Sequence, residues 1–390
     1  MTTAHADKSI WWKLYHGETS FDFVGTMKRW FTISAIVILV GLIALVFRGL
    51  NFGIDFRGGT AWEVPTSKPS VAAARDALRP LGLAESKITQ IGSGANAIIR
   101  VQADPQSGTA EERKAKQAQI TDALAKKLGV DTAKISVNEV GPTWGTDISR
   151  KAARALVIFL LLISLYISLR FEWKMAAAAL AALVHDILVT VGVYALSGFE
   201  VTPATVVAFL TILGYSLYDT IVVFDKIEEN TRGLASTGRM TYSDMVTLSM
   251  NQVLMRSLNT SLVAIMPIVS ILFVGAFLLG ATTLQDFGLA LLVGLLTGAY
   301  SSIFIASPVL AWLKEKEPRY SSIRQRLAGR GGAAAPLTPA AAAAVAGGVS
   351  AHRASEPADG DAGVAAATAA PKPKPRNTPA PRPRKKGKRR

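Results

Sequence analysis

The sequence predicts an α-helical, polytopic membrane protein with six transmembrane helices and a small α+β domain between the first two of them. Two observations lead to this fold class. Half of the 390 residues are hydrophobic, and they gather into six long apolar runs. The segment 48–151, between the first and second runs, has the mixed composition of a small soluble domain. The chain is therefore expected to cross the membrane six times and to fold one domain outside it.

Each apolar run is long enough to span a bilayer, which takes about 20 residues of α-helix at about 1.5 Å per residue. The predicted transmembrane segments are 30–47, 152–169, 175–196, 201–224, 256–280 and 287–313. The first of them starts too far from the N-terminus to be a signal peptide. The chain has no cysteine, so its fold uses neither a disulfide nor a thiolate metal site.

The distribution of Lys and Arg predicts the orientation, because short loops rich in these residues stay in the cytoplasm. They are frequent in the N-terminal arm 1–29, in the short loop after the second run, in the loop 225–255 and in the tail 314–390. The two turns on the other side hold one acidic residue each, Glu200 and Asp286. One basic group opposes this orientation, at Arg150, Lys151 and Arg154. Both termini are therefore predicted to be cytoplasmic, and 48–151 extracytoplasmic.

The outer segment alternates strand and helix patterns in the order βαββαβ, which is the ferredoxin-like order. Ser70 and Thr109 are the expected N-caps of its two helices, Glu112 completes a capping box with Thr109, and Gly82 and Gly129 are the expected stops. The predicted elements are a strand at 59–64, a helix at 70–81, strands at 86–91 and 97–102, a helix at 109–128 and a strand at 134–140.

The tail from about Leu327 is rich in Ala, Pro and Gly and ends in a strongly basic stretch. A segment of this composition buries too little apolar area to fold, so the tail is predicted to be mostly disordered. The simpler interpretation is a solvated cytoplasmic tail that reinforces the orientation. The alternative is electrostatic contact with anionic lipid or with the ribosome.

Asp219 is the most informative residue, because it lies inside the apolar run 201–224. A carboxylate in the bilayer core costs about 2.5–3.5 kcal/mol on insertion scales. It is either a structural group satisfied by polar neighbours or a protonatable carrier, and we favour the carrier. Three groups supply its polar surroundings at helical spacing, namely Tyr215, Ser216 and Thr220.

Arg256 is the candidate partner of Asp219. It opens the fifth run, and Asp219 lies five residues before the inner end of the fourth, so both are expected at similar depth near the cytoplasmic face. The alternative is that Arg256 only extends to the membrane surface. Asn259 and Thr260 add hydrogen-bonding groups beside it.

His185 and Asp186 lie near the middle of the third run, where each needs a polar partner inside the bundle. A structural hydrogen bond and a relay role are equally compatible with the pair. A metal site is not expected, because the chain has only four histidines and no further cluster of ligands.

A glycine-rich motif follows the first run, with Gly53, Gly58 and Gly59 around Asp55 and Arg57. We expect a tight junction between helix and domain, fixed by pairing of the two charges. Strand residues follow the glycines, whereas a phosphate cradle needs a helix there, so nucleotide binding is rejected. No nucleophile elbow or Walker loop occurs, and the chain is not expected to be an enzyme.

Four segments resemble the SecD/SecF family of protein-export membrane proteins. They are NFGIDFRGG at 51–59, the pair His185-Asp186, GYSLYDTIVVFDKIEEN at 214–230 and RSLNTS at 256–261. The resemblance covers 25–315, and the single six-helix unit with a small outer domain is similar to the SecF branch in an actinobacterial-type form. Tyr218, where many relatives have Asn, and the basic tail depart from the common pattern.

The resemblance implies a subunit of the Sec translocase in the bacterial cytoplasmic membrane. Such a subunit would use the proton motive force with a SecD-like partner to promote late steps of export. It would also meet the SecY/SecE/SecG channel, the SecA ATPase, a YajC-type subunit, preproteins and membrane lipids. Protons are the only coupling ion expected, with no cofactor, and the implied pathway residues are Asp219, Arg256, His185 and Asp186. The alternative is one half of a proton-coupled RND-type exporter of small molecules or lipids.

Overall fold

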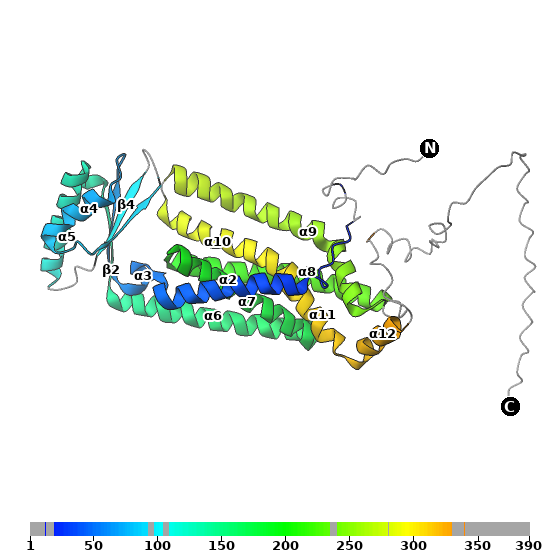
Figure 1. The fold of residues 1–390 in the computed structure, drawn as a ribbon. Helices are drawn as coiled ribbons and strands as arrows, with labels where there is room; N and C mark the ends of the chain where they lie inside the picture. The colour runs from blue at the N-terminus through cyan, green and yellow to red at the C-terminus, as the bar shows by residue number, and fades with distance from the viewer. Residues whose placement is uncertain are drawn as a thin grey trace, which may run out of the picture.

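The computed structural model describes residues 12, 19–92, 97–103, 109–234, 240–279, 281–329 and 339. It consists of a long bundle of helices with a small α/β domain at one end (Figure 1). The predicted turn at 93–96 and most of the basic tail lie outside the described residues.

Six helical segments in the described part are long and apolar enough to cross a membrane, as predicted. The first five are α2 (Met27–Arg48), α6 (Pro142–Arg170), α7 (Trp173–Ser197), α8 (Pro203–Leu234) and α9 (Tyr242–Ser270), which continues into the π-helical segment η5 (Ile271–Leu278). The sixth runs through α10 (Thr282–Ser301), the π-helical segment η6 (Ser302–Ala306) and α11 (Ser307–Glu315), and a short helix, α12 (Pro318–Ala328), follows.

The segment 225–255, predicted as a loop, is helical over most of its length, because α8 extends to Leu234 and α9 already begins at Tyr242. Thr241 caps α9 by accepting a hydrogen bond from the backbone N–H of Asp244. The first turns of α9 bury apolar residues such as Tyr242, Met245 and Val246 together with the polar Ser249 and Asn251. Average hydropathy does not detect such a segment, because apolar and polar residues are mixed in it.

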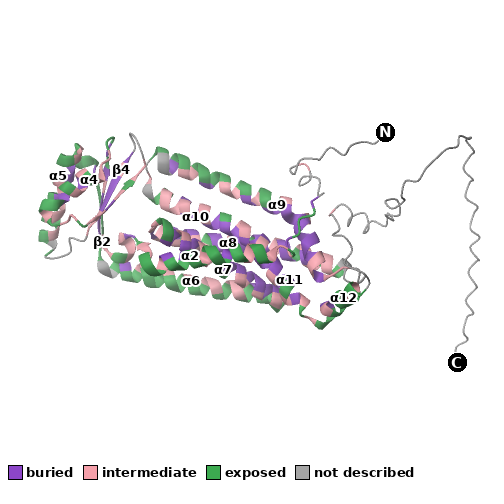
Figure 2. Ribbon diagram, in the orientation of Figure 1, coloured by how far each residue is buried: buried purple, intermediate pink, exposed green. Residues whose placement is uncertain are grey.

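The centre of the bundle is formed by α7, α8 and the α10–α11 segment, which are the most buried spans, whereas α6 is almost entirely exposed (Figure 2). Small residues allow the close approach of these helices. A Cβ on Gly41 of α2 would lie 2.7 Å from the Cα of Gly192 on α7, and one on Gly298 of α10 would lie 2.9 Å from the Cβ of Ser216 on α8. Such contacts are typical of helix packing in membranes.

The small domain has a four-stranded antiparallel sheet in the order β3-β4-β2-β5. Its elements follow the predicted sequence of strands and helices. They are β2 (Gly59–Pro65), α4 (Val71–Leu78), β3 (Lys87–Ile91), β4 (Ile98–Ala103), α5 (Ala110–Leu128) and β5 (Ser136–Val140). One face of the sheet buries Trp62, Ile99 and Val101 against Leu78 and Ile120 of the two helices.

The predicted caps of the two domain helices are confirmed. The Ser70 side chain accepts a hydrogen bond from the backbone N–H of Ala73 at 3.1 Å. Thr109 and Glu112 form the complete capping box. Gly129 ends α5 in the left-handed conformation, with φ at 68°. Local sequence therefore determines where these helices begin and end.

Three short elements join the domain to the bundle. After α2, the strand β1 (Asn51–Phe52) pairs in parallel with β6 (Glu200–Val201), which connects α7 to α8. The single helical turn α3 (Ile54–Arg57) follows and leads directly into β2. The entry to the domain is thereby held against the turn between the third and fourth spans.

Candidate functional site

Asp219 lies in the middle of α8 and is 5% exposed. The hydroxyl of Ser257 on α9 lies 2.9 and 2.8 Å from its two carboxylate oxygens. Ser302, the first residue of the π-helical segment η6, donates to Oδ2 of the same carboxylate. Three separate spans therefore meet at this one acidic group.

The partners of Asp219 are chemically suited to both protonation states of a carboxyl group. A serine hydroxyl donates to an ionised carboxylate and accepts from a protonated one by rotating its hydrogen. Among the described residues, no basic side chain forms an ion pair with Asp219. A buried carboxylate without a cation is costly in its charged form, so this arrangement does not lock the group into one state.

Arg256 does not pair with Asp219 in the described part of the chain. It lies 14 residues after the start of α9, which corresponds to about 21 Å along the helix. Its neighbour Ser257 contacts Asp219, so both predicted partners do share one depth. However, the Arg256 side chain is exposed on the outer side of the bundle and, within the described residues, pairs with no carboxylate. Consecutive helical residues point about 100° apart, so Ser257 takes the inward position.

His185 and Asp186 belong to a second buried polar chain. Asp186 is 1% exposed and accepts a hydrogen bond from Ser216 at 2.5 Å. Its other oxygen lies 3.2 Å from Nδ1 of His185, whose Nε2 is 3.1 Å from the hydroxyl of Ser34 on α2. Ser34 is in turn 2.9 Å from the hydroxyl of Tyr300 on α10. The chain links α8, α7, α2 and α10 through groups that can each exchange a proton.

The other predicted lining residues divide between the interior and the surface. Ser216 is buried one helical turn before Asp219, and Thr220 is buried beside it and donates to the Ser216 carbonyl at 3.0 Å. Tyr215 is half-buried in the apolar cluster at the outer end. Thr260 donates to the Ser257 carbonyl, whereas Asn259 is exposed on the same side of α9 as Arg256.

Sequence reasoning missed three contributors, namely Ser34, Tyr300 and Ser302. Ser34 lies in the first apolar run, and Tyr300 and Ser302 lie in the sixth, where polar residues are few. Ser302 also opens a π-helical segment, a feature frequent at functional sites. The hydroxyl groups in these two runs are the signal that points to these residues, although not to their partners.

The glycine motif fits the expected tight junction. A Cβ on Gly53 would lie 2.5 Å from Oε1 of Glu200, so a larger residue here would displace the Glu200 side chain. Gly58 and Gly59 have φ of 79° and 121°, a backbone conformation that other residues rarely adopt. The two glycines thus make the sharp change of direction from α3 into β2.

The expected pairing of Asp55 with Arg57 is wrong. The two residues lie two positions apart on α3 and therefore point to different sides. Arg57 is exposed and donates to the carbonyl of Leu50 at 3.4 Å. Burial, together with the negative charge of Glu200, raises the pKa of Asp55 above its usual value, although Arg100 acts in the opposite direction.

Arg100 of β4 is the centre of a charged cluster between the domain and the bundle. It donates two hydrogen bonds to Glu63 on the neighbouring strand, at 3.0 and 2.8 Å. It also lies 3.5 Å from Glu200 in β6 and 3.8 Å from Asp286 near the start of α10. Its burial opposes ionisation, but the Glu63 hydrogen bonds and the surrounding carboxylates outweigh this and raise the pKa of Arg100.

Two further side chains complete this cluster. Gln102 donates to both oxygens of Glu200 at 2.7 and 2.8 Å. Lys87 of β3 lies 3.5 Å from Glu200 and donates to the Asn51 side chain at 2.5 Å. We name the set Arg100, Glu63, Gln102, Lys87, Glu200 and Asp286 the junction cluster. It attaches the sheet face opposite the domain helices to β6 and to the first turns of α10. In the part of the chain that the structure describes, no group of three His, Asp or Glu residues is arranged to hold a metal ion.

The sequence matches two family models and several curated proteins. The model described as "Protein export membrane protein SecD/SecF, C-terminal" matches residues 120–316, and the "SecD/SecF GG Motif" model matches residues 43–70. Protein translocase subunit SecF of Streptomyces coelicolor is 44% identical over 349 residues, which is 89% of this chain and 90% of that protein. The SecF of Mycobacterium tuberculosis H37Rv is 42% identical over 312 residues, covering 78% of this chain and 69% of that protein.

Two solved structures have the same fold. The crystal structure of SecDF, a translocon-associated membrane protein from Thermus thermophilus, is similar with a TM-score of 0.67 and 31% identity over 77% of this chain. SecDF in a super-membrane-facing form has a TM-score of 0.54 and 32% identity over 79% of this chain. This chain spans only 39% and 40% of those two chains. The family models cover both the Asp219 site and the glycine motif, and this chain belongs to the SecD/SecF family of protein-export membrane proteins.

Proposed function

We propose that this chain is the SecF-like subunit of a Sec protein translocase and that it couples proton movement to late steps of export. The observation that carries the proposal is the buried Asp219, which is held by hydroxyl groups of two other spans and by no cation in the described residues. A proton that crosses a membrane potential supplies about 2.3 kcal/mol per 100 mV. That energy shifts a conformational equilibrium about fifty-fold.

A SecD-like partner is proposed because this chain matches only part of each SecDF chain. The SecDF chains with this fold are more than twice as long as the part that this chain matches. Arg256 and Asn259 are exposed at the depth of Asp219, where an unpaired cation facing lipid is costly. We propose that the SecD-like subunit covers this side of α9 and supplies a carboxylate for Arg256, which thereby influences proton binding at Asp219. His185 and Asp186 support the path from the other side of α8.

The small domain is proposed to be the extracytoplasmic, ferredoxin-like part that acts on an emerging preprotein. Its βαββαβ order and the strand order β3-β4-β2-β5 fit this arrangement. The junction cluster gives it a direct connection to α7, α8 and α10, so a change in these helices reaches the domain through contacts already present. The channel subunits, the SecA ATPase, the YajC-type subunit and the tail's contacts with lipid or ribosome are proposed from the family alone.

The proposal is tested by export of a preprotein into inverted membrane vesicles, with and without a proton gradient. Asp219→Asn keeps the size of the side chain but cannot titrate. We expect it to abolish the gain that the gradient provides and to leave the ATP-driven part of export intact. Arg256→Lys keeps the charge but loses the planar guanidinium, so we expect it to reduce the gain from the gradient only partially. This reduction should occur only when the SecD-like subunit is present.

Asp225→Asn is the matched control, because Asp225 lies on the same helix but is half-exposed and pairs with Arg170 at the surface. Export by the Asp225→Asn variant should still show the full increase that the proton gradient provides. If Asp219→Asn also retains it, Asp219 has only a structural role, and the proton-coupling proposal is wrong.

The alternative function, one half of an RND-type exporter, has less support. Exporters of this type need a substrate cavity, and the cavity that the outer domain helps to line is a shallow polar one of about 290 Å³ at the junction. Stimulation of proton flux by a small molecule, without any effect of preprotein, would favour the exporter.

A further inference from the structure

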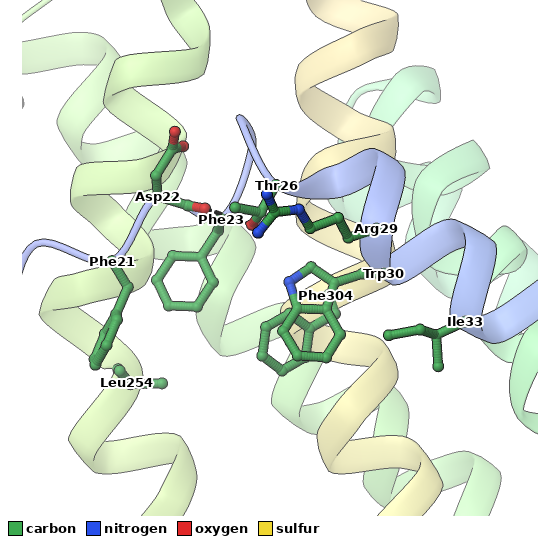
Figure 3. Close-up of a pocket in the computed structure, with 9 residues that line it drawn as sticks. All are labelled: Phe21, Asp22, Phe23, Thr26, Arg29, Trp30, Ile33, Leu254 and Phe304. Atoms are coloured by element: carbon green, nitrogen blue, oxygen red, sulfur yellow. Dashed lines mark hydrogen bonds between the residues drawn. The ribbon is translucent and has the colours of Figure 1, made fainter.

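An apolar groove runs along α2 at the end of the bundle away from the small domain. Its first part has a volume of about 490 Å³, within the range of about 300–1,000 Å³ that is usual for small-molecule sites. Its walls come from the N-terminal arm, α2, α9 and η6 (Figure 3). The lining residues are Phe21, Asp22, Phe23, Thr26, Arg29, Trp30, Ile33, Leu254 and Phe304.

The arm wall of this groove is fixed by hydrogen bonds. The side chain of Asn251 on α9 accepts from the backbone N–H of Phe21 at 3.0 Å and donates to its carbonyl at 2.9 Å. The opposite wall is a stack of rings, with 4.1 Å between the ring centres of Trp30 and Phe304. The groove is therefore a built feature with ordered walls.

A second cavity, of about 280 Å³, lies further along α2, and Ile33 lines both cavities. The other lining residues of the second cavity are Ser34, Val37, His185, Val189, Leu296, Thr297 and Tyr300. From Arg29 to Val37 the helix rises by about 12 Å. The two cavities thus follow one another along α2, an arrangement that suits an extended acyl chain.

One basic residue, Arg29, lines the groove, and Lys28 precedes it on the same helix. Both are exposed, and in the described part of the chain neither forms an ion pair. The one acidic residue of the lining, Asp22, accepts a hydrogen bond from the backbone N–H of Gly25 at 2.7 Å. Figure 3 shows its carboxylate directed away from the guanidinium of Arg29. An exposed guanidinium beside an apolar groove complements a phosphate attached to hydrocarbon.

We propose that this groove binds one anionic phospholipid, with an acyl chain between Trp30 and Leu254 and the phosphate at Lys28 and Arg29. Aromatic residues such as Trp30 prefer the level of the lipid headgroups, which agrees with this depth. Basic pockets between transmembrane helices are a known type of site for such lipids. The bound lipid would hold the N-terminal arm against α9, which is the helix that carries Ser257.

The test uses the full chain in phosphatidylcholine nanodiscs with increasing fractions of phosphatidylglycerol that carries brominated acyl chains, which quench tryptophan on contact. The fluorescence of Trp30 is obtained as the difference between the emission of the native chain and that of Trp30→Phe. The same titration is repeated with brominated phosphatidylcholine. We expect the Trp30 fluorescence to be quenched at a lower mole fraction of brominated phosphatidylglycerol than of brominated phosphatidylcholine. Lys28→Gln with Arg29→Gln should weaken this preference by about fivefold for each charge removed.

Two controls distinguish binding in the groove from a general attraction of anionic lipid to basic surface residues. Lys151→Gln with Arg154→Gln removes two exposed charges at the other end of the bundle and should leave the preference unchanged. Ile33→Phe narrows the groove without changing its charge and should reduce the preference. Equal quenching by both lipids, or a preference that survives Ile33→Phe, would overturn the proposal. Loss of quenching when the SecD-like subunit is added would also overturn it, because the groove would then be a subunit interface.

Discussion

At the scale of single residues, the two buried carboxylates of the bundle differ in their partners. Asp219 is bonded only by hydroxyls, whereas Asp186 shares a hydroxyl and an imidazole. All of these partners can reverse the direction of a hydrogen bond. A fixed cation such as Lys or Arg would instead hold a carboxylate in its ionised form. The hydroxyl environment of Asp219 is therefore the residue-level feature that supports the proposed proton carriage.

Removal of these hydroxyls tests this interpretation directly. Ser302→Ala leaves the hydrogen bond from Ser257, so we expect a partial loss of the gradient-dependent export. The double change Ser257→Ala with Ser302→Ala removes both hydroxyl partners of Asp219. It should reduce gradient-dependent export as much as Asp219→Asn does. Because the three residues act on one group, adding Asp219→Asn to the double change should cause no further loss. Fully additive losses in the vesicle assay would contradict a shared site.

Asp219 itself could be identified from the sequence, because an isolated carboxylate in an apolar run is costly enough to need a reason. Its partners could not. The free-energy cost of a serine in a membrane helix is small, so its presence does not stand out. Helical periodicity shows which residues share a face of one helix, but not which residues of two helices meet. The sequence predicts Arg256 as the partner on the fifth span, whereas its neighbour Ser257 contacts Asp219, because consecutive helical residues point about 100° apart.

At the scale of elements, the domain and the bundle are joined by strands, a helical turn and charges together. The β1–β6 pair positions Glu200, and the sheet brings Arg100 and Gln102 to it from the other side. Arg100 is 9% exposed and faces three carboxylates, so its loss would leave buried like charges together. The junction cluster thus depends mainly on this one cation.

Arg100→Ala is therefore expected to weaken the docking of the domain by about 3 kcal/mol. Hydrogen exchange of the backbone amides in β3, β4 and β6 should become faster, while the six spans stay protected. Arg79→Ala is the matched control, because its ion pair with Asp76 on the domain surface is mostly exposed. That change should alter stability by no more than about 0.5 kcal/mol. Equal exchange in the two variants would mean that the junction cluster does not hold the domain.

The elements of the small domain were predictable because its signals are local. Ser70, the capping box at Thr109 and Gly129 mark helix ends within a few residues of sequence. The junction cluster was not predictable, because it joins β4 to β6 and α10, which are far away in the chain. Glu200 and Asp286 had been noticed only as the acidic residues of their turns, and their role depends on the packing of the whole domain.

At the scale of the whole molecule, α8 links the two polar regions. It begins directly after Glu200 and Val201 at the junction and carries Asp219 in its middle, about 24 Å along the helix from Pro203. A rigid helix transmits a displacement over this distance without an intervening hinge. If α8 moves when Asp219 changes its protonation state, the junction cluster is the first part of the outer region to respond.

This arrangement requires the domain and the tail to lie on opposite sides of the membrane. The basic loops predict that the domain is outside, although Arg150, Lys151 and Arg154 oppose that orientation. Because the chain has no cysteine, single cysteines report on it without interference. In intact cells, we expect a membrane-impermeant maleimide to label Glu111→Cys, on the exposed surface of α5, and to label Ser322→Cys, exposed on α12, only after the membrane is opened. The reverse pattern would place the domain in the cytoplasm, where it could not act on an emerging chain, and the proposed coupling would fail.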